Sequence, residues 1–385
     1  MSQLSYMDKL LDGVEVEWIT LGEVGKVRMC KRVLKHQTSD SGEVPFYKIG
    51  TFGKEPNAYI NQDLFNEYKT KYSYPKIGEV LISASGTIGR TVIFDGRKAY
   101  FQDSNIVWIE NNESQVLNKY LFYFYQVVNW NVSEGGTIKR LYNDNLRKIQ
   151  IPIPPLKIQA EIVRILDAFT ELTAELTAEV VARRKQYAYY RGQLLSFEEV
   201  NVEWKALGEL AENLDSKRKP ITSGLREAGE IPYYGASGIV DYVKDYIFDG
   251  DYLLVSEDGA NLTARNTPIA FSISGKNWVN NHAHVLKFET YAERRYVEYY
   301  LNSIDLTPYI SGAAQPKLNQ KNLNSIRIPN PSLEEKERIV TILDKFNALT
   351  TSLTEGLPRE IALRQQQYEY YRELLLSFPK VEDNV

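Results

Sequence analysis

The sequence is poor in the residues that bind metals or form disulfides. It contains one cysteine, Cys30, and three histidines among 385 residues. A single cysteine excludes an intramolecular disulfide and a metal site built from several thiolates. His282 and His284 could share one face of a strand, but neither a thiolate nor an HExxH spacing accompanies them. We therefore expect no metal in this chain.

Long apolar segments are also missing. The longest, YLFYFYQVV at 120–128, is far shorter than the roughly 20 residues that cross a bilayer. Residues 1–18 contain no apolar stretch of signal-peptide length. These absences favour a cytoplasmic protein that does not enter a membrane.

The loops that bind nucleotides in many enzymes are absent too. No GxxxxGK[ST] sequence occurs, which excludes a P-loop ATPase or motor. GTIG at 86–89 is typical of a turn between strands. NPS at 330–332 is only faintly similar to the NPPF box of amino-methyltransferases, and no glycine-rich S-adenosylmethionine motif accompanies it. The sequence predicts a chain that catalyses nothing alone and binds no cofactor itself.

Charge is mixed, with a net value of −4. This excludes a surface that is basic overall, but not a local basic patch. Basic residues cluster at Lys139-Arg140, Arg147-Lys148, Arg183-Arg184-Lys185 and Lys217-Arg218-Lys219. Each cluster is either a solvated face or part of a surface that binds nucleic acid.

What the sequence does have is internal repetition. QYAYYRGQLLSF at 186–197 returns as QYEYYRELLLSF at 367–378, and VEVEWITLGEV at 14–24 returns as VNVEWKALGEL at 200–210. RLYNDNLRKIQIPIPPL at 140–156 corresponds to KLNQKNLNSIRIPNPSL at 317–333. The chain is therefore two tandem halves whose ends match well and whose middles differ. A shared frame with two diverged inserts suits a protein that reads two different ligands.

Each half ends in a predicted long helix, with apolar residues three or four positions apart. Gly356-Leu357-Pro358 predicts a kink or a break in the second helix. An apolar stripe of this length must be buried, and its simplest partner is its own duplicate. The predicted stripe comprises Ile162, Leu166, Phe169, Leu172 and Leu176 in the first helix, and Ile339, Leu343, Phe346, Leu349 and Leu353 in the second.

The two inserts have the composition of compact α+β domains. EVLISAS, RTVIFD and SNIVWIE have the composition of strands with glycine-rich turns between them. LNKYLFYFYQVV and RRYVEYYLNSI each predict a single helix.

Several of these phrases together resemble a known family. PLKIQAEIVRILDAF, its counterpart PSLEEKERIVTILDKF, the QYxYYRxxLLSF endings and the LTAELTAE tract resemble the specificity subunit of type I restriction-modification systems. The tract looks especially like the subgroup whose helices carry tetrapeptide repeats. The resemblance covers nearly the whole chain.

The resemblance implies an α+β fold with pseudo-two-fold symmetry. Two tandem target recognition domains would alternate with two long spacer helices that pair as an antiparallel coiled coil. We expect the first recognition domain at 1–150, the first spacer helix at 151–198, the second recognition domain at 199–328, and the second spacer helix with the C-terminal tail at 329–385.

The resemblance also implies a function and partners. Each recognition domain would read one half of an asymmetric bipartite site in double-stranded DNA. Two methyltransferase subunits would dock on the helices and carry S-adenosylmethionine. Restriction subunits with motor and nuclease activity would use ATP and Mg. The chain itself would be a non-catalytic recognition subunit.

Polar and cationic residues of the inserts are the candidate DNA contacts, because cations and amides bind phosphates and polar side chains read base edges. Some of them, including Gln102 and His282, could instead satisfy backbone groups at strand edges. The candidates are Ser85, Gly86, Thr87, Arg90, Gln102, Ser104, Asn105, Lys139 and Arg140 in the first domain, and Lys217, Arg218, Lys219, Asn261, Arg265, Asn281, His282, His284 and Lys317 in the second.

Two other functions remain open. One is a coiled-coil adaptor that joins two proteins without reading DNA. It would bind nucleic acid weakly and without salt dependence, whereas a DNA reader loses affinity steeply as salt rises. The other is a methyltransferase or nuclease fragment, against which the missing cofactor motif counts. The half-site sequences and the length of the unread gap do not follow from the residues.

Overall fold

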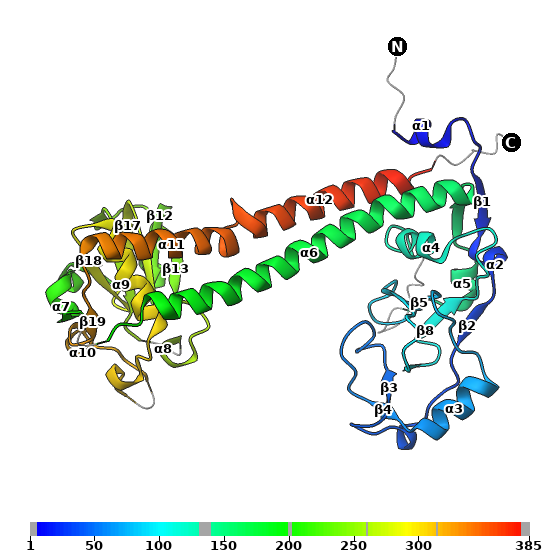
Figure 1. Cartoon of the computed structure of the whole chain (residues 1–385), viewed down its shortest axis with the longest axis horizontal. Coiled ribbons are helices and arrows are strands. Elements are labelled where there is room, and N and C mark those ends of the chain that lie inside the picture. The colour runs from blue at the N-terminus through cyan, green and yellow to red at the C-terminus, as the bar shows by residue number, and fades with distance from the viewer. Residues whose placement is uncertain (1–5, 131–139, 199–201, 259–260, 313–314, 379–385) are drawn as a thin grey trace, which may run out of the picture. The chain divides into compact units, whose positions relative to one another are not determined.

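The computed structural model describes residues 6–130, 140–198, 202–258, 261–312 and 315–378. The chain forms two compact units. The first comprises Met1–Leu176 with Ile361–Val385, and the second comprises Thr177–Glu360. One helix, α6 (Leu156–Leu194), begins in the first unit and ends in the second (Figure 1). No helix of the described part of the chain is long and apolar enough to span a membrane.

The first unit is organised around a four-stranded antiparallel sheet with the order β2-β8-β5-β6. Every residue of β5 and β8 is buried, which explains their unbroken apolar sequences. A three-stranded sheet, β4-β3-β7, and the pair β1-β9 complete the strands. The strand bounds are β1 Glu17–Thr20, β2 Val27–Met29, β3 Val44–Tyr47, β4 Tyr59–Ile60, β5 Val80–Ser83, β6 Thr91–Ile93, β7 Tyr100–Phe101, β8 Ile106–Ile109 and β9 Gln150–Ile153.

The second unit repeats this plan. Its sheets have the orders β11-β18-β15-β16, β13-β12-β17-β14 and β10-β19. As in the first unit, two central strands of the first sheet, here β15 and β18, are almost wholly buried. The strand bounds are β10 Trp204–Ala206, β11 Glu212–Asn213, β12 Ala228–Gly235, β13 Gly238–Val243, β14 Phe248–Asp249, β15 Tyr252–Ser256, β16 Ala270–Ile273, β17 Lys276–Val279, β18 Ala283–Lys287 and β19 Arg327–Pro329.

Helices cover the sheets and form the frame. The expected strands at EVLISAS, RTVIFD and SNIVWIE are confirmed as β5, β6 and β8, and the two expected insert helices as α4 and α9. The remaining helix bounds are α1 Tyr6–Leu11, α2 Leu21–Val24, α3 Gln62–Lys71, α4 Asn118–Phe124, α5 Asn143–Arg147, α7 Leu207–Leu210, α8 Asn261–Ala264, α9 Tyr291–Ser303, α10 Gln320–Asn324, α11 Leu333–Thr351 and α12 Gly356–Leu376.

The second long helix is broken where glycine and proline predicted it. α11 ends at Thr351 and α12 begins at Gly356. Gly356 has a φ of +75°, and a Cβ at this position would lie 2.5 Å from the carbonyl oxygen of Ala348. Glycine is therefore required here both for its backbone conformation and for the close approach.

The predicted apolar stripe needs one correction. Ile162, Leu166, Ile339 and Leu343 are fully buried, as expected. Leu353, however, lies in the break between α11 and α12 and is 81% exposed. The spacing rule failed there because it assumes continuous helix, and the residue leaves the buried face once the helix ends.

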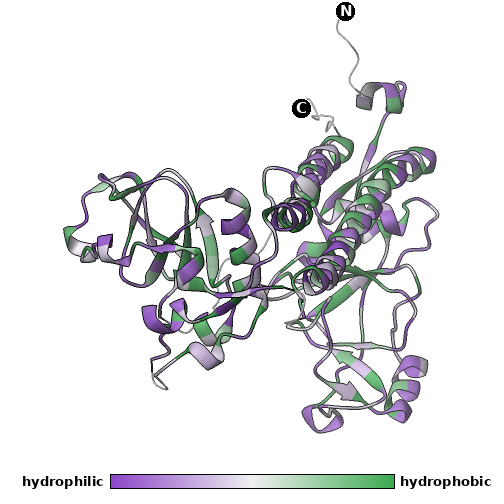
Figure 2. Ribbon diagram, turned by 60° about the vertical axis from the view of Figure 1, so that its left-hand side comes forward, coloured by the Kyte–Doolittle hydropathy of each residue, from purple (hydrophilic) through white to green (hydrophobic). Residues whose placement is uncertain are grey.

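The long helices pack in antiparallel order within the second unit. Arg184 of α6 donates a hydrogen bond to the carbonyl oxygen of Thr350 over 3.5 Å, while Tyr187, further along α6, packs against the earlier residue Phe346 with ring centroids 6.2 Å apart. In the first unit Phe169 of α6 stacks on Tyr371 of α12 at 5.4 Å. Hydrophobic and hydrophilic residues alternate along these helices (Figure 2), as expected where only one face is buried.

Candidate nucleic-acid interface

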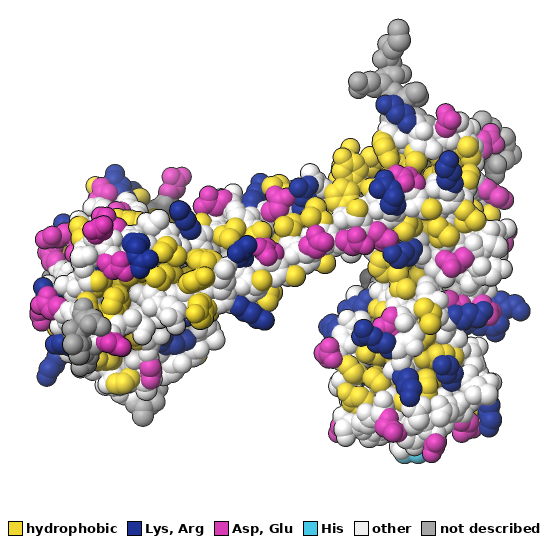
Figure 3. Space-filling model, in the orientation of Figure 1, with side chains coloured by type: hydrophobic (Ala, Val, Ile, Leu, Met, Phe, Trp, Pro, Cys, Tyr) yellow, Lys and Arg dark blue, Asp and Glu magenta, His cyan; other side chains and the backbone are white. Residues whose placement is uncertain are grey.

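Charges of both signs are interspersed on the face of the molecule shown in Figure 3, which agrees with the small net charge. A binding surface for an anionic polymer must therefore be local. In each unit, some of the candidate residues lie just beyond the ends of the two central strands, β5 and β8 or β15 and β18.

In the first unit, Ser85, Asn105 and Arg140 form one cluster. The Ser85 hydroxyl donates to Asn105 Oδ1 over 2.8 Å, and Arg140 Nη2 donates to the same oxygen over 3.4 Å. Ser85 and Arg140 also form an isolated antiparallel backbone bridge. Ser85 is buried, whereas Arg140 is exposed. The structure thus brings together three candidates that lie up to 55 positions apart in the sequence.

A cavity of about 310 Å³ adjoins this cluster. Four cationic side chains line it, three of which the sequence analysis did not single out: Arg32, Lys35 and Lys48, in addition to Arg140. Among the lining side chains is one carboxylate, Asp103, which accepts a hydrogen bond from Arg32 over 2.9 Å. The excess of cations suits a phosphate. The basic run Lys31-Arg32 was the available sequence signal.

The other first-unit candidates differ in exposure and in their hydrogen-bond partners. Ser104 is exposed and has a left-handed φ of +50°. Gln102 lines the cavity, but its side-chain oxygen accepts a hydrogen bond from the Ile49 amide. Gly86 and Thr87 are exposed in the turn after β5. Arg90 donates to the Phe52 carbonyl over 2.9 Å. Lys139 lies outside the described residues.

In the second unit, Asp258, His282 and Lys317 form the corresponding cluster. His282 Nδ1 lies 2.9 Å from the Asp258 carboxylate, and its side chain is 52% exposed. Asp258 and Lys317 form an isolated backbone bridge, as Ser85 and Arg140 do. The sequence analysis missed Asp258, because a lone acid is not a usual DNA ligand.

Two second-unit candidates lie inside the protein rather than on its surface. Arg218 is held by the Glu257 carboxylate at 2.6 Å and by the Ala283 carbonyl at 2.8 Å. His284 is 1% exposed, and its two ring nitrogens lie 2.6 Å from Asp215 and 2.6 Å from the Leu318 carbonyl. Burial and these partners exclude His284 from direct contact with DNA in this conformation, and we remove both residues from the proposed contact set.

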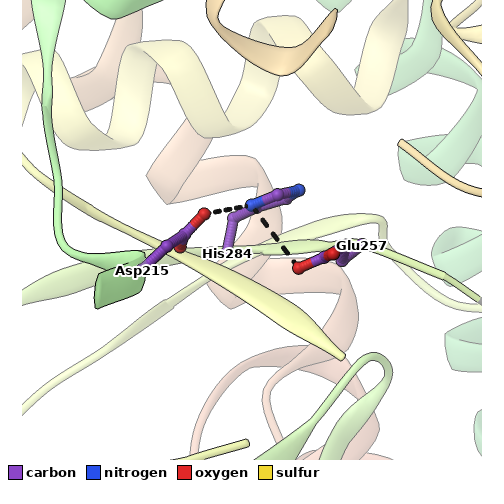
Figure 4. A group of neighbouring side chains, drawn as sticks. All are labelled: Asp215, Glu257 and His284. Carbon is purple, nitrogen blue, oxygen red and sulfur yellow. Dashed lines mark hydrogen bonds and ion pairs between the residues drawn. The ribbon is translucent and has the colours of Figure 1, made fainter. Parts of the chain in front are cut away.

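His284, Asp215 and Glu257 lie together as one charged group (Figure 4). Arg218 and Lys317 extend this network through their ion pairs with Glu257. Burial by itself raises the pKa of Asp215, but His284, the Val285 amide and Arg218 together outweigh it and lower that pKa. The pKa of Glu257 is likewise lowered, since Arg218, His284 and Lys317 together outweigh burial. Both carboxyl groups are therefore ionised at neutral pH.

The same three side chains are the group that could hold a metal ion among the residues described, with ligand atoms within 4.8 Å of one another. Their surroundings do not fit a cation. Arg218 and Lys317 already contact Glu257, and both nitrogens of His284 are engaged. The donor set is an internally compensated ion network.

The remaining candidates are spread over the second unit. Lys217, Lys219 and Asn281 are exposed. Asn261 hydrogen-bonds both backbone groups of Thr267 and thereby closes a loop. Arg265 has a left-handed φ of +50° and, with Arg191, lines a cavity of about 230 Å³.

A second kind of surface is formed by the repeated QYxYYR endings. Tyr189 is 63% exposed and meets Tyr190 edge to face at 5.4 Å. Tyr190 stacks on Phe346 at 5.8 Å. In the first unit the same arrangement recurs with Tyr370 (64% exposed), Tyr371 and Phe169. We call these two groups the tyrosine clusters.

Comparison with known proteins agrees with this architecture. The chain is 37% identical over 412 aligned positions to the specificity subunit of the type I restriction enzyme EcoR124I/EcoR124II of Escherichia coli, covering 99% of both chains. It is 62% identical over 197 residues to a type I restriction enzyme specificity subunit of Haemophilus influenzae, covering 50% of this chain and 51% of that protein.

Solved structures show the same fold. The crystal structure of the type I restriction-modification S subunit from M. genitalium matches with a TM-score of 0.57 at 16% identity, covering 96% of this chain and 98% of that one. The family model for the type I restriction modification DNA specificity domain matches twice, at residues 13–182 and 199–363. The chain therefore belongs to the family of type I restriction-modification DNA specificity subunits, which are not themselves catalytic.

Proposed function

We propose that each unit reads one half of an asymmetric bipartite sequence in double-stranded DNA. The observation that carries this proposal is that one sheet plan occurs twice and bears different side chains at the same strand ends. Two equal frames with unequal loops favour two unequal half-sites. The adaptor alternative does not account for a cluster of cations around a cavity in the variable part of the first unit.

Affinity in the first half-site would come mainly from the cations of that cavity. Arg32, Lys35 and Lys48 are exposed and can reach phosphates. Exposed Lys217 and Lys219 would serve the second unit in the same way. Each phosphate neutralised releases counterions, so affinity should fall steeply with salt.

The partners supply the chemistry in this proposal. S-adenosylmethionine would be bound by methyltransferase subunits, and ATP and Mg by restriction subunits. In this proposal the present chain binds none of the three. We propose the cytoplasm as the compartment, because a protein that recognises genomic DNA must be present where that DNA is.

We assign the two tyrosine clusters to the docking of two identical methyltransferase subunits. Two matching, exposed aromatic groups suit two copies of one partner, because each copy presents the same surface. Exposed tyrosine offers a large contact area at a small cost in side-chain entropy.

The decisive experiment is a methylome comparison. Cells carrying the cognate methyltransferase gene, shown to be active with another specificity subunit, would be sequenced with and without this chain. A bipartite N6-methyladenine motif that appears only with this chain is expected. No new motif, with the complex demonstrably assembled, would favour the adaptor function.

Docking is tested separately by replacing Tyr189 and Tyr370 with alanine. We expect recovery of the methyltransferase with the tagged chain to fall at least tenfold, since two aromatic anchors of one interface type are lost. Tyr246→Ala is the matched control, because Tyr246 is 46% exposed and lies outside the repeat. Equal recovery from all three chains would remove the tyrosine clusters from the interface.

A further inference from the structure

The two recognition units correspond residue by residue at the ends of their central strands. Ser83 pairs with Ile106 in the first unit, and Ser256 pairs with Ala283 in the second. One position further along, the Ala84 amide donates to the Asn105 carbonyl over 2.8 Å, and the Glu257 amide donates to the His282 carbonyl over 2.9 Å. The strands therefore leave the two sheets in the same register.

The next positions complete the correspondence. Leu141 donates its amide to the Ala84 carbonyl, and Leu318 donates to the Glu257 carbonyl. The isolated bridges then join Ser85 to Arg140 and Asp258 to Lys317. It follows that Ser85, Asn105 and Arg140 of the first unit occupy the same backbone sites as Asp258, His282 and Lys317 of the second.

Side-chain contacts recur as well, although the residues differ. The first two members of each trio are hydrogen-bonded: Ser85 to Asn105 at 2.8 Å, and Asp258 to His282 at 2.9 Å. The third member is an exposed cation in both units, but its partner differs: Arg140 donates to Asn105, whereas Lys317 pairs with Glu257 at 3.1 Å. The backbone positions and the contact between the first two members are thus kept, while all three residue types change.

We propose that these two trios are the principal specificity-determining positions of the two half-sites. The inference rests on the proposed function and adds to it which positions set base preference: Asn105 and His282 read the base edge, and Ser85 and Asp258 orient them through their hydrogen bonds. A site that keeps its backbone register and one side-chain contact, yet changes all of its side chains, has the property that a base-reading centre requires.

The hydrogen bonds also indicate what the two trios offer to a base edge. Asn105 Oδ1 accepts from both Ser85 and Arg140, which leaves the amide hydrogens of Asn105 to donate. Donors favour the acceptors of guanine, adenine N7 or thymine O4. In the second unit, the Asp258 carboxylate accepts the Nδ1 hydrogen of His282, which leaves Nε2 to accept when the ring is neutral. An acceptor favours the amino groups of adenine or cytosine.

The test exchanges the first trio for the second in the full chain with its methyltransferase: Ser85→Asp, Asn105→His and Arg140→Lys. We expect the first half-site to change at one or more base pairs while the second half-site stays the same. The unchanged half reports that the complex is folded and assembled. The reciprocal exchange, Asp258→Ser with His282→Asn and Lys317→Arg, should alter only the other half.

A matched control makes the same chemical changes at exposed residues of the first unit outside the trio: Ser41→Asp, Asn66→His and Arg97→Lys. This control should retain both half-sites.

If the trio exchange also retains both half-sites, with methylation within about twofold of the parent, the inference is overturned. If methylation is lost everywhere, selection of bound duplexes from a randomised pool decides. Selected DNA with both parental half-sites contradicts the inference, whereas loss of the first half-site alone supports it. Failure of the proposed function is distinct, because the parent chain itself would then give no bipartite motif.

Discussion

The two recognition units share a frame but differ in what fills it. At three corresponding positions the first unit has apolar residues and the second has ionisable ones: Met29, Ala84 and Val107 in the first, and Asp215, Glu257 and His284 in the second. Met29 pairs with Val107 in the sheet, and Asp215, which follows β11, contacts His284 through its side chain. Ala84 and Val107 are buried, and so are Glu257 and His284. The same backbone therefore accepts either an apolar packing or a compensated ion network.

An arginine shows how far this difference reaches. Arg32 and Arg218 each lie three residues after the first of these positions. The Arg32 side chain is 67% exposed and contacts Asp103 beside the cationic cavity. The Arg218 side chain is 13% exposed and is held by Glu257. In the second unit the Glu257 carboxylate binds Arg218 inside the protein, so this arginine has a structural role. In the first unit Arg32 stays exposed and available to a ligand.

If the two units are independent readers on one frame, a longer α6 should change only the spacing between their half-sites. This change in methylated sequence is the largest effect that we expect. One additional TAEL tetrapeptide after Leu176 adds about 6 Å to the helix and about 40° beyond a full turn. We expect loss of methylation at the original sites and a new motif whose gap is longer by one or two base pairs, with both half-sites unchanged. A methylome showing altered half-sites would mean that the helix does not act as a spacer.

Replacing the two arginines by alanine should separate their roles. Arg218→Ala leaves buried Glu257 without its closest cation, and we expect the second unit to lose about 3 kcal/mol of unfolding free energy. Arg32→Ala should change stability by less than about 0.5 kcal/mol, because the Arg32 side chain is 67% exposed and water screens its pair with Asp103. Urea unfolding of the full chain measures both, and equal effects of the two substitutions would contradict the distinction.

Acid should also affect the buried carboxyl groups beside the two central sheets in opposite directions. The pKa values of Asp215 and Glu257 are lowered in the folded second unit, so their contribution to stability is present above their unfolded values, roughly pH 4, and is lost as pH falls through the folded values. In the first unit burial raises the pKa of Glu79, so stability is lost as pH rises through that folded value.

Hydrogen exchange resolved by peptide, and corrected for its intrinsic pH dependence, can follow both units in one sample. Between pH 6 and pH 3 we expect protection of β15 and β18 to fall first, with protection of β5 and β8 retained longer. Simultaneous loss in both units would show that the ion network does not control the acid response. His284→Val, which removes the network's imidazole, provides the comparison at each pH.

The smallest expected effect concerns the exposed lysines. Lys35→Ala and Lys48→Ala in the first unit, and Lys217→Ala and Lys219→Ala in the second, should each weaken binding to all sequences alike. Each lost phosphate contact should reduce the slope of log affinity against log salt by about 0.9. Binding titrations of the assembled complex at several salt concentrations measure this. A substitution that changes the preferred sequence instead would place that lysine among the base-reading residues.

Much of the fold could be predicted from the residues. The repeated phrases located the frame, the apolar spacing located α6 and α11, and Gly356 with Pro358 located the break before α12. The exposure of Leu353 could not be predicted, because a periodic rule carries no information about where a helix ends. Candidate DNA contacts were recognised by residue type, which cannot distinguish exposed Lys217 from Arg218, its neighbour that is drawn inside.

The duplication, the α+β class and the family follow from the order of residues, since they depend on patterns that repeat along the chain. Which polar residues come into contact depends on folding in three dimensions. Ser85, Asn105 and Arg140 come together because β5, β8 and the segment before α5 end side by side, and Asp258 becomes their counterpart through strand register alone. The apolar pattern of a strand specifies which of its faces is buried, but it does not say which residue of a distant strand lies opposite each position.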